Sequence, residues 1–229
     1  MSFSANLGID DLASRDLPSF ASRLARLENV LPEPLWRRLG AEVGALVDSE
    51  RTYLPAHKKG GTVAYATLEQ HAPGIVAVYR SPEFRHLISG IVGIAVEPTP
   101  LHDQSSCSLL FYDRPGDHIG WHYDHNFYRG RHFTVLVPLV NRGHGPDGLS
   151  AARLIGHVNG REVIIPTAPN SMIVFEGARV RHKVMPIAEG EYRVVWSMTY
   201  CADPRNSAWQ GLARRVKDTA FFGLRALWT

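Results

Sequence analysis

The sequence predicts an α+β protein in which a β-sandwich or barrel is flanked by helices at both ends of the chain. Residues 1–96 carry apolar side chains mainly at helical spacing. From residue 97 to about residue 202, short β-like runs alternate with turn residues, which is typical of an all-β unit. We therefore expect residues 97–202 to form the core. In residues 203–229 helical spacing returns and predicts a C-terminal helix, whose apolar side consists of Trp209, Leu212, Val216 and Phe221.

The length and composition favour a single soluble domain over residues 1–229. Apolar residues make up 45% of the chain and charged residues 21%, which excludes collagen-like, coiled-coil and disordered chains. We expect no membrane span, because no run of about 18 apolar residues occurs, and no secretory signal at the N-terminus. The net charge of +3 is scattered, and two cysteines cannot form a disulfide framework. We therefore expect a cytoplasmic protein that has neither a nucleic-acid nor a membrane partner.

The N-terminal part is predicted to be mainly helical. Apolar residues at helical spacing predict a helix over residues 16–27 and, after a proline-rich break, a second helix over residues 34–49. The polar, glycine-containing segment Lys58–Thr62 predicts a flexible loop. Ser81 precedes a proline and is expected to cap a further helix that ends near Ile91.

The predicted β-rich core contains seven short strands separated by Gly, Pro and Asn turn residues. Asn159-Gly160 lies between two apolar runs and is a strong β-hairpin signal. Short strands at this spacing are typical of a sandwich or barrel. The strands are expected at residues 105–112, 117–124, 132–140, 151–157, 161–165, 171–175 and 191–200.

The chain has 11 histidines, and those in the strand predicted at residues 117–124 are the most informative about function. Strand alternation predicts one face formed by His118, Gly120, His122 and Asp124. The same alternation predicts the opposite face to consist of Ile119, Trp121 and Tyr123. A histidine and a carboxylate two positions apart on one strand can bind the same metal ion.

A third metal ligand and a cation are expected further along the chain. The best third ligand is His182, which follows an apolar strand and a turn. Two histidines and one carboxylate that leave positions open suit a non-haem Fe(II) ion that activates oxygen. Arg193 follows in an otherwise apolar strand, where a buried guanidinium is costly unless a carboxylate pairs with it. A bound dicarboxylate would supply that partner.

The order His-x-Asp, distal histidine and then arginine on the following strand resembles the Fe(II)/2-oxoglutarate-dependent oxygenases. Segment 111–116 also resembles the superfamily's approach to the His-x-Asp motif, segment 133–141 its next strand, and segment 170–175 the strand that leads to the distal histidine. The resemblance covers about residues 100–200. Around residues 116–136 the sequence is most similar to the branch that hydroxylates or halogenates free amino acids.

This resemblance implies a fold, a set of cofactors and a set of site residues. The implied core is a double-stranded β-helix, or jelly roll, and the cofactors are Fe(II), the co-substrate 2-oxoglutarate and O2. The implied iron ligands are His122, Asp124 and His182. The residues implied to hold the distal carboxylate of 2-oxoglutarate are Arg193, Tyr112 and Thr134. The implied reaction decarboxylates 2-oxoglutarate to succinate and hydroxylates a C–H bond of a second substrate.

The expected substrate is a small polar molecule, namely a free amino acid or a derivative of one. The residues expected to contact it are His118, Ser197 and Thr199. A lid formed by the N-terminal helices is one arrangement that would exclude water from the site, and the sequence leaves it open. One alternative is a protein or peptidyl-prolyl hydroxylase. Another is a cupin-like jelly roll that binds metal without catalysis and does not require Arg193. A radical halogenase is disfavoured, because Asp124 fills the position that a halide needs.

Overall fold

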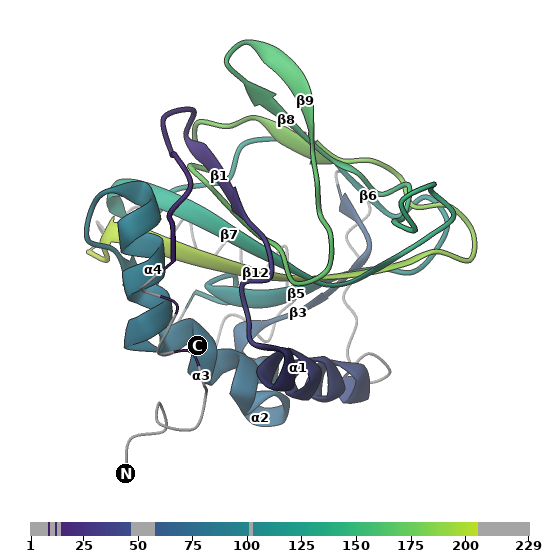
Figure 1. Cartoon of the computed structure of the whole chain (residues 1–229), viewed down its shortest axis with the longest axis horizontal. Helices are drawn as coiled ribbons and strands as arrows, with labels where there is room; N and C mark the ends of the chain where they lie inside the picture. The colour runs from purple at the N-terminus through teal and green to yellow at the C-terminus, as the bar shows by residue number, and fades with distance from the viewer. Residues whose placement is uncertain (1–8, 10–11, 13–14, 47–57, 101–102, 206–229) are drawn as a thin grey trace.

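The computed structural model describes residues 9, 12, 15–46, 58–100 and 103–205, and it consists of two antiparallel sheets with helices on one side (Figure 1). The larger sheet has the strand order β1-β10-β7-β12-β5-β3, and β4 pairs with β12. Its strands are β1 (Leu24–Leu27), β3 (Gly61–Val63), β4 (Glu97–Pro98), β5 (Cys107–Tyr112), β7 (Arg129–Arg142), β10 (Met172–Phe175) and β12 (Tyr192–Asp203). The smaller sheet has the order β2-β6-β11-β8-β9. Its strands are β2 (Lys58–Lys59), β6 (His118–His122), β8 (Leu154–Val158), β9 (Arg161–Ile165) and β11 (His182–Val184).

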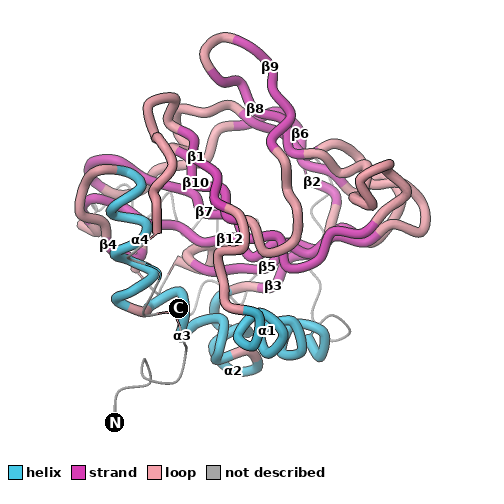
Figure 2. The backbone as a smooth tube through the Cα atoms, viewed as in Figure 1, coloured by secondary structure: helices cyan, strands magenta, loops and turns pink. Residues whose placement is uncertain are grey.

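The chain crosses repeatedly from one sheet to the other, which winds it into a jelly roll (Figure 2). Strands β5, β6 and β7 lie in the larger, the smaller and again the larger sheet, and β10, β11 and β12 repeat this pattern. Every strand pair is antiparallel. The predicted α+β fold with a jelly-roll core is therefore confirmed.

The larger sheet is covered on both faces, and strand alternation decides which side chains face the interior. On β12, Val194 and Trp196 belong to the apolar cluster under the helices, whereas Val195 belongs to the cluster between the sheets. Arg193 and Ser197 therefore face the space between the sheets. The helices that cover the outer face are α1 (Glu33–Leu46), α2 (Tyr65–His71), α3 (Pro73–Arg80) and α4 (Pro82–Val92).

Two expectations for the N-terminal part are wrong. The segment predicted as a helix over residues 16–27 instead ends in β1, which pairs with the edge of β10. Sheet hydrogen bonds formed at long range outweigh the weak local preference for helix here, and Arg23 turns the chain with a φ of 61°. The segment predicted as a flexible loop, residues 58–62, supplies β2 and part of β3. Gly60 joins these two strands with a φ of 146°, and a Cβ there would lie 2.8 Å from the Phe111 carbonyl oxygen.

Other expectations are confirmed where the structure describes them. Ser81 caps α4, since its hydroxyl accepts a hydrogen bond from the Phe84 N–H at 3.1 Å. The turn at Asn159-Gly160 joins β8 to β9, and all seven predicted strands are present, with β7 longer than expected. Asp203 ends β12, and residues 206–229 of the predicted C-terminal helix lie outside the described residues.

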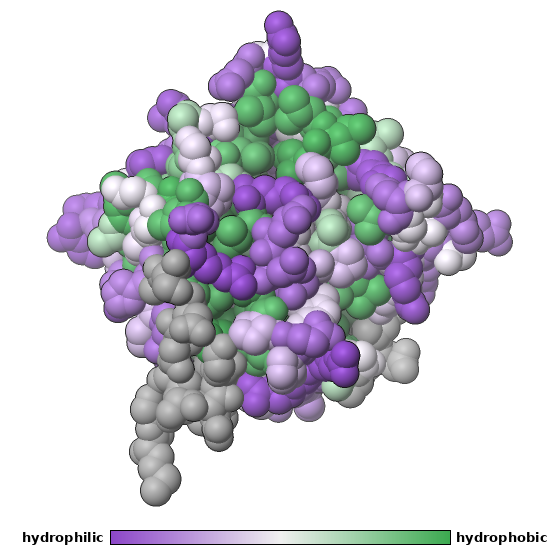
Figure 3. All heavy atoms as spheres, viewed as in Figure 1, coloured by the Kyte–Doolittle hydropathy of each residue, from purple (hydrophilic) through white to green (hydrophobic). Residues whose placement is uncertain are grey.

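The β8–β9 hairpin projects from the smaller sheet, and apolar side chains gather near it on the surface (Figure 3). Val163 and Ile164 are exposed there. None of the described helices combines the length and the apolar character that crossing a membrane requires.

Candidate metal centre and co-substrate pocket

A β-bulge in β6 brings the first candidate ligand into the interior. Along β11 two steps separate His182 from Val184, but their partners His122 and Ile119 are three steps apart on β6. The extra residue lies in the Gly120-Trp121 segment, and bulges commonly redirect a side chain beside an active site. As a result, Ile119 and His122 both line the space between the sheets.

This bulge corrects the strand-alternation argument for His118. The uninterrupted alternation placed His118 on the same face as His122, whereas the structure places Ile119 there instead. The His118 ring contacts the Gly116 carbonyl oxygen through Nδ1 at 2.8 Å, and the residue pairs with Lys59 of β2. His118 lines neither of the two pockets described below, so its predicted contact with substrate gains no support.

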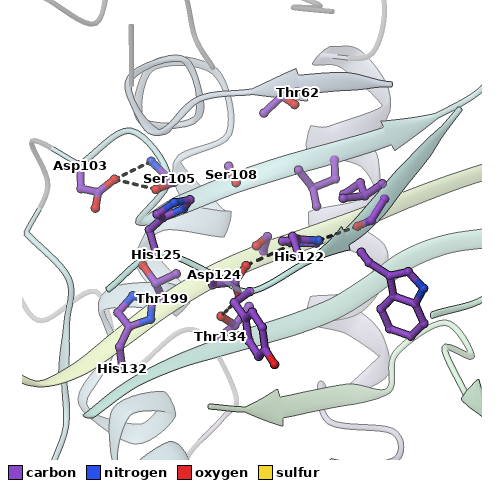
Figure 4. Close-up of a pocket in the computed structure, with 16 residues that line it drawn as sticks. Thr62, Asp103, Ser105, Ser108, His122, Asp124, His125, His132, Thr134 and Thr199 are labelled. Atoms are coloured by element: carbon purple, nitrogen blue, oxygen red, sulfur yellow. Dashed lines mark hydrogen bonds and ion pairs between the residues drawn. The ribbon is translucent and has the colours of Figure 1, made fainter. Parts of the chain in front are cut away.

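Three candidate metal ligands converge between the two sheets, as Figure 4 shows for two of them. His122 ends β6, Asp124 follows two residues later, and His182 begins β11 directly opposite His122. One ligand atom from each residue lies within 4.8 Å of the others. The Oδ1 atom of Asp124 is 3.5 Å from Nε2 of His122 and 3.7 Å from Nε2 of His182. The three residues predicted as ligands are therefore brought together.

Backbone carbonyl groups orient both imidazoles. Nδ1 of His122 lies 2.9 Å from the Gly120 carbonyl oxygen, and Nδ1 of His182 lies 2.9 Å from the Val180 carbonyl oxygen. A carbonyl oxygen only accepts hydrogen bonds, so Nδ1 carries the hydrogen and the lone pair of Nε2 points toward Asp124. Burial lowers the pKa of His182, although Asp124 opposes this, and so favours the neutral ring that a metal requires.

The Asp124 carboxylate is held in its ionised form from both sides. Burial raises the pKa of Asp124, but in the metal-free site the charges that His182 and His122 carry when protonated, and hydrogen bonds from protonated His122 and from Thr134, lower this pKa further than burial raises it. The Thr134 hydroxyl donates to Oδ2 of Asp124 at 2.5 Å, and the Asp124 N–H donates to the Gly177 carbonyl at 3.0 Å. Two neutral imidazoles and one carboxylate form the donor set that suits Fe(II).

Arg193 provides a buried cation beside this centre. Only 1% of its surface is exposed, and its Nε and Nη1 atoms have no hydrogen-bond partner within the described parts of the chain. Its strand neighbour Tyr112 is equally buried, and the Tyr112 hydroxyl is likewise without a partner there. The Arg193 guanidinium carbon lies 4.9 Å from the centre of the Tyr112 ring. Burial lowers the pKa of Arg193, which shows the cost of a charge that a bound dianion would offset.

Arg193 and the metal ligands line one small pocket. His122, Asp124 and His182 lie in its wall together with Arg193 and Tyr112. Their shared apolar surroundings consist of Leu110, Ile119, Leu136, Leu154, Phe175, Val184 and Val195. The pocket therefore combines the three candidate metal ligands with the unpaired hydrogen-bond donors of Arg193 and Tyr112.

A larger cavity of about 330 Å³ opens from the same centre (Figure 4). Ser197 and Thr199 line it, which confirms the face predicted for them on β12. Thr134 lines both pockets, but its hydroxyl bonds to Asp124, so its predicted contact with 2-oxoglutarate stays a prediction. The polar residues that complete the cavity are Thr62, Asp103, Ser105, Ser108, Tyr123, His125 and His132.

Gly177, which was not predicted as a site residue, makes room for the centre because it has no side chain. A Cβ at this position would collide with the Asp124 carboxylate and lie 2.7 Å from Oγ1 of Thr134. An isolated glycine that follows an apolar strand is the only signal the sequence offers for such a close approach.

The fold and this site together define an Fe(II)/2-oxoglutarate-dependent oxygenase, the class whose cofactors are Fe(II), 2-oxoglutarate and O2. Within that class, residues 18–144 match the family described as HalD, halogenase D. The match spans more than half of the chain, so the protein belongs to this family. No curated protein matches the sequence.

Solved structures confirm the fold at low sequence identity. A 2OG-Fe(II) oxygenase family oxidoreductase from Burkholderia pseudomallei is 15% identical with a TM-score of 0.65, over 88% of this chain and 94% of that one. A Trichoplax adhaerens prolyl hydroxylase in complex with a peptide is 17% identical with a TM-score of 0.61, over 87% and 89%. The epimerase SnoN in complex with Fe3+, α-ketoglutarate and nogalamycin RO is 15% identical with a TM-score of 0.64, over 84% and 83%.

Proposed function

We propose that this protein is an Fe(II)/2-oxoglutarate-dependent dioxygenase that hydroxylates a C–H bond of a small polar substrate, a free amino acid or a derivative of one. The observation that carries the proposal is the juxtaposition of the His122–Asp124–His182 cluster with the buried guanidinium of Arg193. A protein that merely bound a metal would gain nothing from a buried, unpaired arginine, which costs stability.

Each residue of the site has a role in this reaction. Fe(II) bound at the centre would supply oxygen activation coupled to decarboxylation of 2-oxoglutarate. His122 and His182 would donate Nε2 lone pairs to the metal, and Asp124 would donate Oδ1. Arg193 and the Tyr112 hydroxyl would bind the distal carboxylate of 2-oxoglutarate, which orients its keto acid end toward the metal.

The carboxylate of Asp124 favours hydroxylation over halogenation, although the family takes its name from a halogenase. A halide would need the position at the metal that Oδ1 of Asp124 faces. The hydrogen bond from Thr134 and the backbone bond to Gly177 hold the carboxylate in that position.

The cavity supports a small substrate. Its volume of about 330 Å³ is at the lower end of the range for small-molecule sites, and its polar side chains suit several directed hydrogen bonds. Ser197 and Thr199 are the residues that we expect to contact the substrate.

Both cysteines are free and buried, which agrees with a reducing cytoplasmic environment. Hydroxylation of a peptide is the competing proposal, since one similar fold was solved with a peptide bound.

Two experiments test the proposal. First, 2-oxoglutarate added to the anaerobic Fe(II) protein should produce a visible charge-transfer band, because the keto acid chelates the metal. A protein that binds metal without using 2-oxoglutarate would show no band.

Second, succinate release should be measured with free amino acids and with unstructured peptides. Turnover with peptides alone would replace the small-molecule proposal by that of a protein hydroxylase.

A further inference from the structure

We propose that Thr134 and Gly177 are positioning residues that fix the Asp124 carboxylate as a single-oxygen ligand and so keep one metal position open beside the co-substrate. The inference rests on the metal centre of the proposed function but not on the substrate or the reaction. It assigns Thr134 a role different from the contact with 2-oxoglutarate that the resemblance implies.

The two oxygens of Asp124 have different neighbours. Oδ1 faces Nε2 of His122 at 3.5 Å and Nε2 of His182 at 3.7 Å. Oδ2 accepts the hydrogen bond from the Thr134 hydroxyl at 2.5 Å. Thr134 is 5% exposed and lies within the long strand β7, so its side chain has little freedom to follow a rotating carboxylate. One oxygen is therefore directed to the metal and the other is held away from it.

This division matters because of how many ligands the metal must take. A site with two histidines and one carboxylate serves oxygen chemistry because it leaves positions open. A chelating keto acid and O2 would use those positions. A carboxylate that bound through both oxygens would occupy one of them. The hydrogen bond from Thr134 to Oδ2 opposes that binding mode.

Gly177 completes the arrangement from the segment that precedes β11. Asp124 lies beyond the end of β6, so the strand ladder does not fix it, and its N–H instead donates to the Gly177 carbonyl at 3.0 Å. A side chain at position 177 would collide with the Asp124 carboxylate and press on the Thr134 hydroxyl. The neighbouring Glu176 anchors this segment, because its N–H donates to the Arg23 carbonyl at 3.0 Å and its carboxylate lies 3.4 Å from Arg131. The segment therefore cannot move away freely to admit a side chain.

The test compares metal binding with co-substrate binding in Thr134→Val. Metal-free protein is titrated with Co(II), whose visible absorption reports binding, and the Co(II)-saturated protein is then titrated with 2-oxoglutarate. Loss of a hydrogen bond to a ligating carboxylate should weaken Co(II) binding by about 10- to 100-fold. Thr134→Ser keeps the hydroxyl and should restore most of the affinity. A carboxylate bound through both oxygens would take the position that O2 uses and leave those that the chelating keto acid needs. The dissociation constant of 2-oxoglutarate from the Co(II)-saturated variant should therefore stay close to the wild-type value.

Thr167→Val is the matched control. Thr167 is also buried, at 2% exposure, and its hydroxyl accepts a hydrogen bond from the Asn141 side chain, but it lines neither pocket. This control should bind Co(II) as the wild type does. Gly177→Ala, checked for folding by circular dichroism, should weaken Co(II) binding as Thr134→Val does.

Unchanged Co(II) affinity in Thr134→Val would overturn the proposal, and a selective loss of 2-oxoglutarate binding would assign Thr134 to the co-substrate instead. These titrations need no turnover. An inactive wild type would therefore count against the proposed function and leave this inference standing.

Discussion

Replacement of Arg193 by methionine should change the stability of the protein in opposite directions with and without 2-oxoglutarate. In the absence of the co-substrate, the wild type buries a guanidinium that is 1% exposed and whose Nε and Nη1 lack partners among the described residues. Methionine has a similar length and no charge. Replacement of a buried ion pair by apolar residues of similar volume is often neutral or stabilising by about 1–4 kcal/mol, and an unpaired guanidinium lacks even the attraction that such a pair retains.

The favourable contact of Arg193 with Tyr112 is lost in this replacement and opposes the gain in stability. The guanidinium lies 4.9 Å from the Tyr112 ring centre, and such a cation–π contact contributes about 0.5–2 kcal/mol. We therefore expect Arg193→Met to be as stable as the wild type or up to about 2 kcal/mol more stable without 2-oxoglutarate. For a chain of this size, each kcal/mol raises Tm by about 2–4 °C.

Addition of 2-oxoglutarate should reverse the order. A ligand at about one hundred times its Kd stabilises the state that binds it by about 2.7 kcal/mol, which corresponds to a rise in Tm of roughly 5–10 °C. The wild type should show this rise and Arg193→Met should show almost none. The assay is thermal unfolding of the Mn(II)-loaded proteins with and without 2-oxoglutarate.

Arg142→Leu is the control, since the Arg142 guanidinium lies 5.6 Å from the Tyr192 ring centre but is exposed and lines neither pocket. It should respond to 2-oxoglutarate as the wild type does. An equal rise in Tm for wild type and Arg193→Met would refute the assignment of Arg193 to the co-substrate. A strong loss of stability in Arg193→Met without ligand would show that the buried guanidinium does not cost stability in the absence of 2-oxoglutarate.

Three further predictions follow from the described residues. Asp124→Ala should abolish metal binding, measured by metal analysis after dialysis, yet unfold within a few degrees of the metal-free wild type, because the jelly-roll core does not depend on the ion. Burial raises the pKa of Cys107 and of Cys201 to about 12, so neither thiol should react with iodoacetamide at mildly alkaline pH until urea unfolds the chain. Mass spectrometry measures this labelling, and labelling of the native protein would contradict the burial of the two thiols. Ser81→Ala removes the N-cap of α4 and should cost about 1 kcal/mol in denaturant unfolding, whereas Ser81→Asp should retain most of the stability.

The sequence was sufficient to place side chains wherever strand alternation ran without interruption. On β12 it placed Arg193, Ser197 and Thr199 on one face, and the structure shows all three lining the pockets. It also singled out His182 as the third candidate ligand, although the three-residue strand β11 that holds it was too short to predict. Local patterns succeed here because the side-chain direction on a regular strand depends only on residue parity.

The same parity rule failed on β6, where the bulge at Gly120-Trp121 exchanged the faces of His118 and Ile119. The prediction of a helix over residues 16–27 failed for a related reason, since β1 exists only because β10 presents an edge to pair with. A bulge and an added edge strand both depend on partners that are distant in sequence. No local pattern records those partners.

The sequence by itself determined a β-rich core of the sandwich or barrel class, the three candidate ligands and the apolar strand that holds Arg193, and its resemblance to a known superfamily implied the jelly roll. Only the tertiary structure decided how the ligands are held. The contact of Thr134 with Asp124 joins β7 to the end of β6, and the space for that contact exists because Gly177 approaches from a third segment. Composition and periodicity describe one segment at a time, whereas the position of a ligating oxygen is set by atoms from several segments that meet only when the chain folds.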